Sequence, residues 1–138
     1  MGQYFLLVNK SKKEYICPHC IECGAKLWEW CASIQSGIAL YLLRTSSERG
    51  GGDIDDIKDY PSAGRWAGDK IYLVGDYDKS KLYHKARKTY KNISIEVMKE
   101  YQKFIGEEII PPDARECEAC KSENRKEDKN EWKRIEIF

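Results

Sequence analysis

Alternating apolar and polar runs near the start of the chain predict a β-hairpin. Residues 3–9 are mostly apolar, the turn at 9–12 is polar, and residues 14–17 are again mostly apolar. Two runs of strand-forming residues joined by a short polar turn are typical of a hairpin. At the other end of the chain, residues 135–138 could add a last short strand.

A second pattern, in segment 70–76, predicts a strand that is covered on both faces. Because successive side chains of a strand point to opposite faces, Ile71 and Leu73 share one face and Tyr72 and Val74 share the other. Both faces are therefore apolar, which is typical of a central, buried strand rather than of a half-exposed one.

Residues 26–43 predict one long core helix. Apolar side chains recur there at the 3.6-residue spacing of an α-helix, at Leu27, Cys31, Ile34, Ile38 and Leu42. This spacing assigns Cys31 to the core as a small apolar residue. Two shorter helices are expected at 79–91 and at 94–106, the second with Ser94 as its N-cap.

Two short cysteine pairs, one near each end of the chain, carry the most specific chemical signal. A Cys-x2-Cys turn points two thiolates at one ion, and two such turns complete a tetrahedral zinc site. The first pair precedes Gly24, which favours a tight turn. The spacing predicts one structural zinc ion, since four protein ligands leave no position for a substrate, and its ligands would be Cys20, Cys23, Cys117 and Cys120.

Several alternatives to this ligand set remain open. Cys17 could replace Cys20 or Cys23, and His19 could serve as a ligand. Disulfides or free thiols are a second interpretation, since disulfides do occur in the cytosol of hyperthermophiles. An iron–sulfur cluster on the three closely spaced cysteines is a third.

The predicted fold class is α+β. It has a mainly antiparallel sheet with the N-terminal hairpin and a buried central strand, one long core helix, two shorter helices and a zinc-tied C-terminal tail. Residues 1–110 are expected to form the domain, and residues 111–138 a C-terminal extension packed back on it through a Cys-x2-Cys knuckle. Trp66, in the Gly-rich turn before the central strand, is expected to be buried over the sheet.

Length and composition are those of a globular domain. The 138 residues suffice for one core, and a net charge of +1 indicates neither an acidic partner nor a nucleic acid. The longest uncharged apolar run, 30–43, is too short for a membrane span, and the N-terminus shows no secretion signal. We expect no membrane association and a cytoplasmic location. Abundant Lys, Glu, Ile and Tyr favour a thermophilic source.

Carboxylates beside glycines and turns form a second candidate site. With His19, they could build a hard-metal or acid–base site at the end of the 70–76 strand, the candidates being Asp53, Asp69, Asp76 and Asp78. The alternative is structural, because aspartate side chains also cap turns and helices.

A basic run offers a third candidate. Residues 79–91 contain six Lys or Arg residues and no acidic residue, and Lys81, Lys85 and Lys88 line one side of the predicted helix. Such a stripe can contact phosphates. The alternatives are a solvated helix face and neutralisation by the acidic segment 53–59.

These residues also carry a resemblance. The chain is similar to a family of small uncharacterised proteins of bacteria, phages, archaea or archaeal viruses with the motifs MGQYxxxVNxxKKEYI, GGGD and GxWAGDxIxxVGDYD. The motifs correspond here to 1–16, 50–53 and 64–78. The cysteines depart from the family pattern, so the resemblance implies a shared site region around the motifs and a zinc site added in this branch. It implies no particular activity.

Two functions from different classes remain open. The first is a zinc-stabilised binding or regulatory protein that acts on nucleic acid or a host protein. If it is encoded by a virus, it would act in the host cytoplasm. The alternative is a small hydrolase with an Asp/His site at the end of the 70–76 strand. The sequence does not decide whether the protein is an enzyme.

Overall fold

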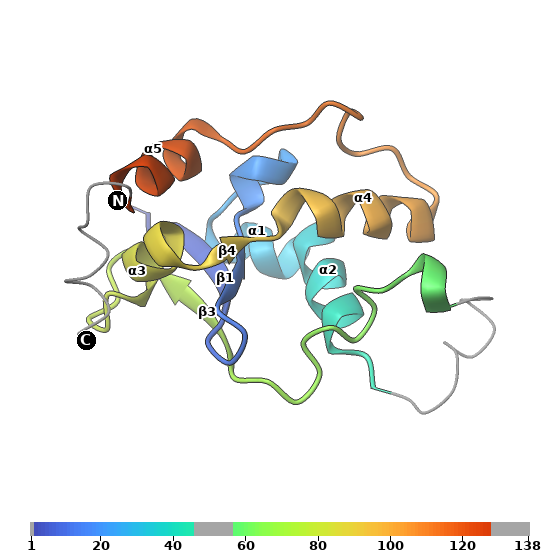
Figure 1. The fold of residues 1–138 in the computed structure, drawn as a ribbon, viewed down its shortest axis with the longest axis horizontal. Coiled ribbons are helices and arrows are strands. Elements are labelled where there is room, and N and C mark those ends of the chain that lie inside the picture. Colours follow the sequence, from blue (N-terminus) through green and yellow to red (C-terminus); the bar gives the residue numbers. More distant parts are fainter. Residues whose placement is uncertain (1, 46–56, 128–138) are drawn as a thin grey trace.

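The computed structural model describes residues 2–45 and 57–127. Within these residues the chain forms a single sheet, five α-helices and two short 3-10 helices (Figure 1). In chain order the elements are β1 (Phe5–Asn9), β2 (Glu14–Ile16), η1 (Pro18–Ile21), α1 (Leu27–Ala32), α2 (Ile34–Leu43), η2 (Ile57–Asp59), β3 (Ile71–Gly75), α3 (Leu82–Thr89), β4 (Lys91–Asn92), α4 (Ser94–Ile105) and α5 (Glu118–Glu127).

The sheet confirms the predicted α+β class and the N-terminal hairpin. Its strand order is β3-β1-β2-β4, with β1 antiparallel to β2 and β3, and β2 parallel to β4. Val8 of β1 pairs with Tyr15 on one side and Tyr72 on the other. The hairpin turn is fixed because the Asn9 side chain accepts a hydrogen bond from the Lys12 amide (2.8 Å).

Helices cover both faces of the sheet and form two cores. Leu7 of β1 packs into a cluster with α1, α2 and α4, which includes Trp30 and Val97. Leu6 and Val8 point to the opposite face and pack against α3. Figure 1 shows α3 and α5 on one side of the sheet and α1, α2 and α4 on the other. The alternation of side chains along β1 therefore divides the interior into two layers.

The prediction of a buried central strand at 70–76 is wrong in its placement. Among the described residues β3 lies at the edge of the sheet, and β1 takes the central position. Val74 is buried under α3, whereas Tyr72, on the same face, is 47% exposed. Apolar residues on both faces do not distinguish a central strand from an edge strand whose partner helix covers only one end.

The predicted long helix at 26–43 is broken at Ser33. This residue is extended (φ −123°, ψ −169°) and separates α1 from α2. Because the helical period restarts there, the apolar stripe of the first half does not continue into the second. Cys31, predicted as a core residue, is exposed, and Trp30 is buried instead.

The two shorter predicted helices are confirmed as α3 and α4, although Ser94 is the first residue of α4 and Ile93 its N-cap, and Gly106 ends α4 in the left-handed conformation (φ 75°). Helix α5 was not predicted. The strand expected at 135–138 lies outside the described residues. No helix in the described part of the chain is long and apolar enough to cross a membrane.

Trp66 is fully buried, as predicted, and it anchors a buried carboxylate. Its indole N–H donates to Glu14 on β2 (2.8 Å), and Arg65 forms a two-pronged ion pair with the same carboxylate (3.2 and 2.6 Å). Burial raises the pKa of Glu14, but the bonds from Arg65 and Trp66 outweigh it, so the pKa lies below its usual value. The turn before β3 is thereby attached to the hairpin.

We expect Trp66→Ala to lower the free energy of unfolding by about 3–5 kcal/mol, because it removes a large core side chain. Trp28→Ala is the matched control, since Trp28 is 74% exposed, and its effect should stay within about 0.5 kcal/mol. Urea denaturation of both variants measures the difference. Equal midpoints for wild type and Trp66→Ala would contradict the buried position.

Candidate metal centre

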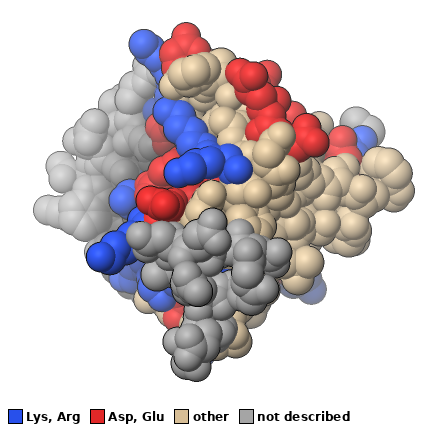
Figure 2. Space-filling model, turned by 90° about the vertical axis from the view of Figure 1, so that its right-hand side faces the viewer, with Lys and Arg blue, Asp and Glu red and all other residues tan. Residues whose placement is uncertain are grey.

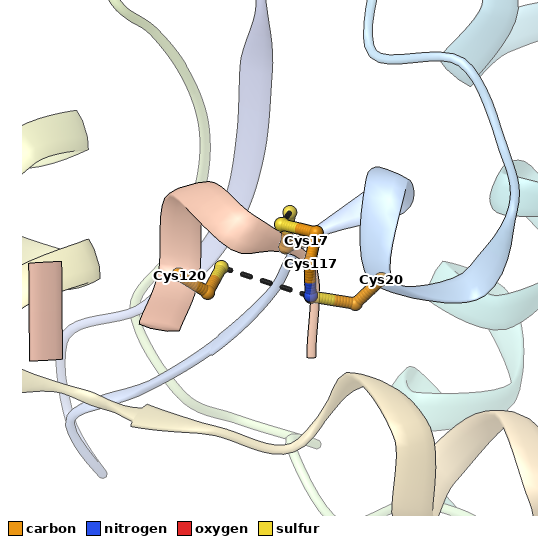
Figure 3. A group of neighbouring side chains, drawn as sticks. All are labelled: Cys17, Cys20, Cys117 and Cys120. Atoms are coloured by element: carbon orange, nitrogen blue, oxygen red, sulfur yellow. Dashed lines mark hydrogen bonds between the residues drawn. The ribbon is translucent and has the colours of Figure 1, made fainter. Parts of the chain in front are cut away.

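Four cysteines from the two ends of the chain meet on the α3 side of the sheet. One sulfur from each of Cys17, Cys20, Cys117 and Cys120 lies within 4.8 Å of the others. Figure 3 shows the four side chains pointing toward one another, two from the segment around η1 and two from the start of α5. Cys17, Cys20 and Cys120 are buried and Cys117 is half-buried, so the site is closed to solvent on most sides.

The first pair is positioned by the end of β2 and a single 3-10 turn. Cys17 precedes Pro18, whose fixed φ suits the first position of η1. The Cys17 amide donates to the Ser94 hydroxyl (2.7 Å), and the turn closes where the Cys23 amide donates to the Pro18 carbonyl (2.9 Å). This turn directs both Cys17 and Cys20 inward.

The second pair is positioned by the first turn of α5. Cys117 lies directly before the helix, and its carbonyl accepts from the Lys121 amide (3.1 Å), while Cys120 lies one turn into it. The N-terminal end of a helix carries partial positive charge, which stabilises nearby thiolates. Helix α5 packs against α3, so the tail is held over the same core as the first pair.

The sulfur spacing fits a tetrahedral ion and excludes disulfides. The Sγ atoms of Cys17 and Cys117 are 3.9 Å apart, and those of Cys20 and Cys120 are 3.7 Å apart. With metal–sulfur bonds of about 2.3 Å, tetrahedral ligands lie about 3.8 Å from one another. A disulfide needs about 2.05 Å, and all six cysteines are free. The four cysteines are positioned to bind a metal ion.

Neighbouring groups donate hydrogen bonds to the sulfurs. The Tyr15 hydroxyl donates to Cys120 Sγ (3.2 Å), the Asn92 side-chain amide to Cys20 Sγ (3.4 Å), and the backbone amide of Cys117 also to Cys20 Sγ (3.3 Å). Burial and the nearby thiols raise the pKa of Tyr15, so it remains a donor. Such donors orient metal ligands and stabilise their negative charge.

Arg87 brings a positive charge to the cluster. Its guanidinium approaches Cys17 Sγ (Nη2 to Sγ 3.6 Å) and stacks on the Tyr83 ring, 4.9 Å from the centroid. Its Nε atom is buried and has no hydrogen-bond partner within the described residues, where Arg87 also forms no ion pair with a carboxylate. In the sequence, Arg87 is one of six basic residues in segment 79–91. No feature of that segment distinguishes Arg87 as the residue whose side chain reaches the cysteines.

Mutual hydrogen bonding separates the acidities of the four thiols. Bonds from Cys120, Cys17 and Cys20 hold the pKa of Cys117 far below that of a free thiol. The bond to Cys117 is the main cause that raises the pKa of both Cys20 and Cys120. Hydrogen bonding within the cluster therefore favours the thiolate at Cys117 and the thiol at Cys20 and Cys120.

The structure brings Cys17, the alternate ligand, into the cluster and leaves out Cys23. The Cys23 thiol donates to the Ile21 carbonyl (3.4 Å). Burial and the carboxylates of Glu22 and Glu29 raise its pKa to about 11, which disfavours the thiolate. His19 is exposed and packs its ring edgewise on Tyr4. The glycine after Cys23 favoured the pair Cys20 and Cys23, whereas the turn of the structure begins at Pro18 and brings Cys17 and Cys20 to the cluster.

The candidate acidic residues do not converge. Asp69 precedes β3, where it bonds to Asn9 and Lys12, whereas Asp76 and Asp78 follow the other end of the strand. Asp76 accepts from the Tyr4 amide (3.1 Å), and Asp78 caps the turn at Ser80. Asp53 lies outside the described residues. The structural interpretation thus accounts for the three described aspartates.

The candidate lysines all belong to α3 or its N-cap. Lys81 is exposed, Lys85 and Lys88 are half-buried, and none of the three forms an ion pair with another described residue. The acidic segment expected to neutralise them, 53–59, lies mostly outside the described residues.

Comparisons with models of protein families, with curated proteins and with solved structures gave no match. The resemblance based on the motifs at 1–16, 50–53 and 64–78 stays a prediction. Fold and site together define an α+β protein with a four-cysteine cluster suited to a metal ion.

We expect Cys17→Ser to weaken metal binding strongly, because it removes one of four sulfur ligands. Cys23→Ser is the matched control and should bind metal like the wild type. Titration of the reduced protein with Co²⁺, followed by its thiolate charge-transfer absorption, compares the two. Loss of binding in Cys23→Ser with binding kept in Cys17→Ser would instead support the set that the spacing suggested.

Proposed function

We propose that the protein is a zinc-stabilised binding protein and that one structural Zn²⁺ is held by Cys17, Cys20, Cys117 and Cys120. The observation that carries this proposal is the spacing of the four sulfurs, which matches a tetrahedral thiolate site. A tetrahedral set of four sulfurs suits zinc or iron. A closed site that joins residues 100 positions apart favours the redox-inert ion in a structural role.

The position of Arg87 supports a charged, metal-loaded centre. Arg87 is half-buried with a buried Nε atom, and such a cation is costly unless an opposite charge lies near it. Four neutral thiols or two disulfides would give Arg87 no counter-charge in the described part of the chain. Four thiolates around Zn²⁺ carry a net charge of −2, which the guanidinium partly neutralises. The free cysteines also suit a reducing cytoplasm, that of the host cell if the protein is encoded by a virus.

In this proposal, the basic side of α3 is the binding surface and its partner is nucleic acid. Lys81, Lys85 and Lys88 have no carboxylate partner among the described residues and can contact phosphates. On the side that Figure 2 shows, Lys and Arg near the centre lie next to Asp and Glu. A host protein is the other partner class. The hydrolase is not favoured, since its aspartates lie at both ends of β3.

The metal is tested by elemental analysis of the purified, reduced protein, with one zinc per chain expected. Arg87→Met should weaken zinc binding about 10- to 100-fold, as loss of a group that supports metal ligands commonly does. Arg115→Met is the control, because Arg115 is exposed although it precedes Cys117 by two positions. Competition with a zinc chelator measures both affinities.

Stoichiometric iron, or intramolecular disulfides in protein that was never oxidised, would contradict the zinc proposal. Removal of the metal should also lower the melting temperature, because binding to the folded state alone is coupled to stability. An unchanged melting temperature after complete removal would show that the metal does not stabilise the fold.

If the basic side of α3 binds duplex DNA, the affinity should fall as the salt concentration rises. In a plot of the logarithm of the binding constant against the logarithm of the salt concentration, each neutralised phosphate should add roughly −0.9 to the slope. Replacing Lys81, Lys85 and Lys88 with Ala should reduce the magnitude of that slope by about 3. Lys99→Ala combined with Lys103→Ala is the control, since both are exposed on α4 on the other side of the sheet. A protein that binds neither DNA nor RNA at low salt would end the nucleic-acid proposal.

A further inference from the structure

A pocket of about 310 Å³ lies where α3 begins beside the edge strand β3. This volume is at the lower end of the range of small-ligand sites, about 300–1,000 Å³. Its lining mixes polar and apolar side chains, namely Lys10, Tyr72, Leu73, Val74, Asp78, Ser80 and Leu82.

The pocket exists because α3 covers only one end of the sheet face. Tyr72 and Val74 point to the same side, but α3 begins at Leu82 and buries only Val74. Tyr72 lines the pocket and is left 47% exposed. A large aromatic side chain at this place contributes little to the core, so its position favours a role in binding.

The lining includes one cation, Lys10, and one anion, Asp78. Lys10, from the hairpin turn, places Nζ 5.9 Å from the centroid of the Tyr72 ring and has no ion pair among the described residues. This distance is at the outer limit of a cation–π contact, so Lys10 can move to a ligand. The Asp78 carboxylate is oriented by the amide of Ser80 (3.0 Å) and by its hydroxyl.

We propose that this pocket binds one unpaired base of a single-stranded nucleic acid, an inference that rests on the proposed nucleic-acid function. The base stacks on the Tyr72 ring, Lys10 contacts a neighbouring phosphate, and Asp78 accepts a hydrogen bond from a base amino group or a ribose hydroxyl. Lys81, next to the pocket at the start of α3, continues the phosphate path. A duplex hides its base faces within the stack, so an aromatic platform selects single strands.

The test measures binding of a fluorescently labelled 15-nucleotide single strand, as DNA and as RNA, and of the matching DNA duplex, by anisotropy at low salt. Tyr72→Ala should weaken single-strand binding about 5- to 150-fold, the effect of losing one stacked base, and leave duplex binding unchanged. Tyr72→Trp should retain binding because it keeps the platform. Tyr77→Ala is the matched control, since Tyr77 is 60% exposed and does not line the pocket.

The possible failures are distinguishable. If wild type binds nucleic acid but Tyr72→Ala binds single strands equally well, the pocket is not a base site, while the proposed function of α3 stands. The same conclusion follows if Tyr72→Ala weakens single-strand and duplex binding equally. If wild type binds neither form, the proposed nucleic-acid function and this inference both fail.

Discussion

The rest of the structure depends on a closed contact between two pairs of thiols. Sulfurs from Cys17 and Cys20 meet those of Cys117 and Cys120 at the spacing of tetrahedral ligands, and each pair is separated from the other by 100 residues. Bringing such distant segments together costs loop-closure entropy, which grows only slowly with length but must be offset by strong contacts. The first turn of α5 adds few apolar groups to the core besides Cys117 and Cys120. A metal ion bound by four thiolates offsets this cost far better than weak S–H hydrogen bonds do.

Charge explains why the cluster lies under α3 rather than on the surface. The sheet divides the interior into two layers, and the layer that α3 covers contains the cysteines together with Tyr15 and Arg87. Hydrogen-bond donors and one guanidinium surround the sulfurs, which is the environment that buried thiolates require. The opposite layer has its own buried charge, the Glu14 carboxylate, and balances it with Arg65 and Trp66. Each layer thus surrounds a polar group with its own partners, the sulfurs with hydrogen-bond donors and Arg87, and Glu14 with Arg65 and Trp66.

The sequence predicted most local elements but not their arrangement. Periodicity identified the hairpin, the strand that became β3, and helices α3 and α4, because these signals are local. It could not place β3 at the edge, since both faces are apolar wherever the strand lies. Periodicity also predicted one continuous helix across Ser33. The extended backbone of Ser33 interrupts that helix, and no Gly or Pro in the sequence signals the break. Cysteine spacing predicted a four-sulfur site, yet three candidates in seven residues left the choice between Cys17 and Cys23 to tertiary structure. Arg87 could not be found in a run of six cations.

Helix α3 connects the two proposed sites. Its first residue, Leu82, lines the pocket with Tyr72, and Arg87, five residues further on, reaches the cysteines. At 1.5 Å per residue these positions are only about 7.5 Å apart along the helix axis. At its start the Leu82 amide donates to the Ser80 hydroxyl (3.2 Å), and Lys81, the N-cap, is in the left-handed conformation (φ 64°). The helix packs against the sheet and against α5. Because the cysteine cluster joins α5 to the rest of the fold and α5 packs against α3, the proposed metal would influence the shape of the pocket, although none of its four proposed ligands lines it.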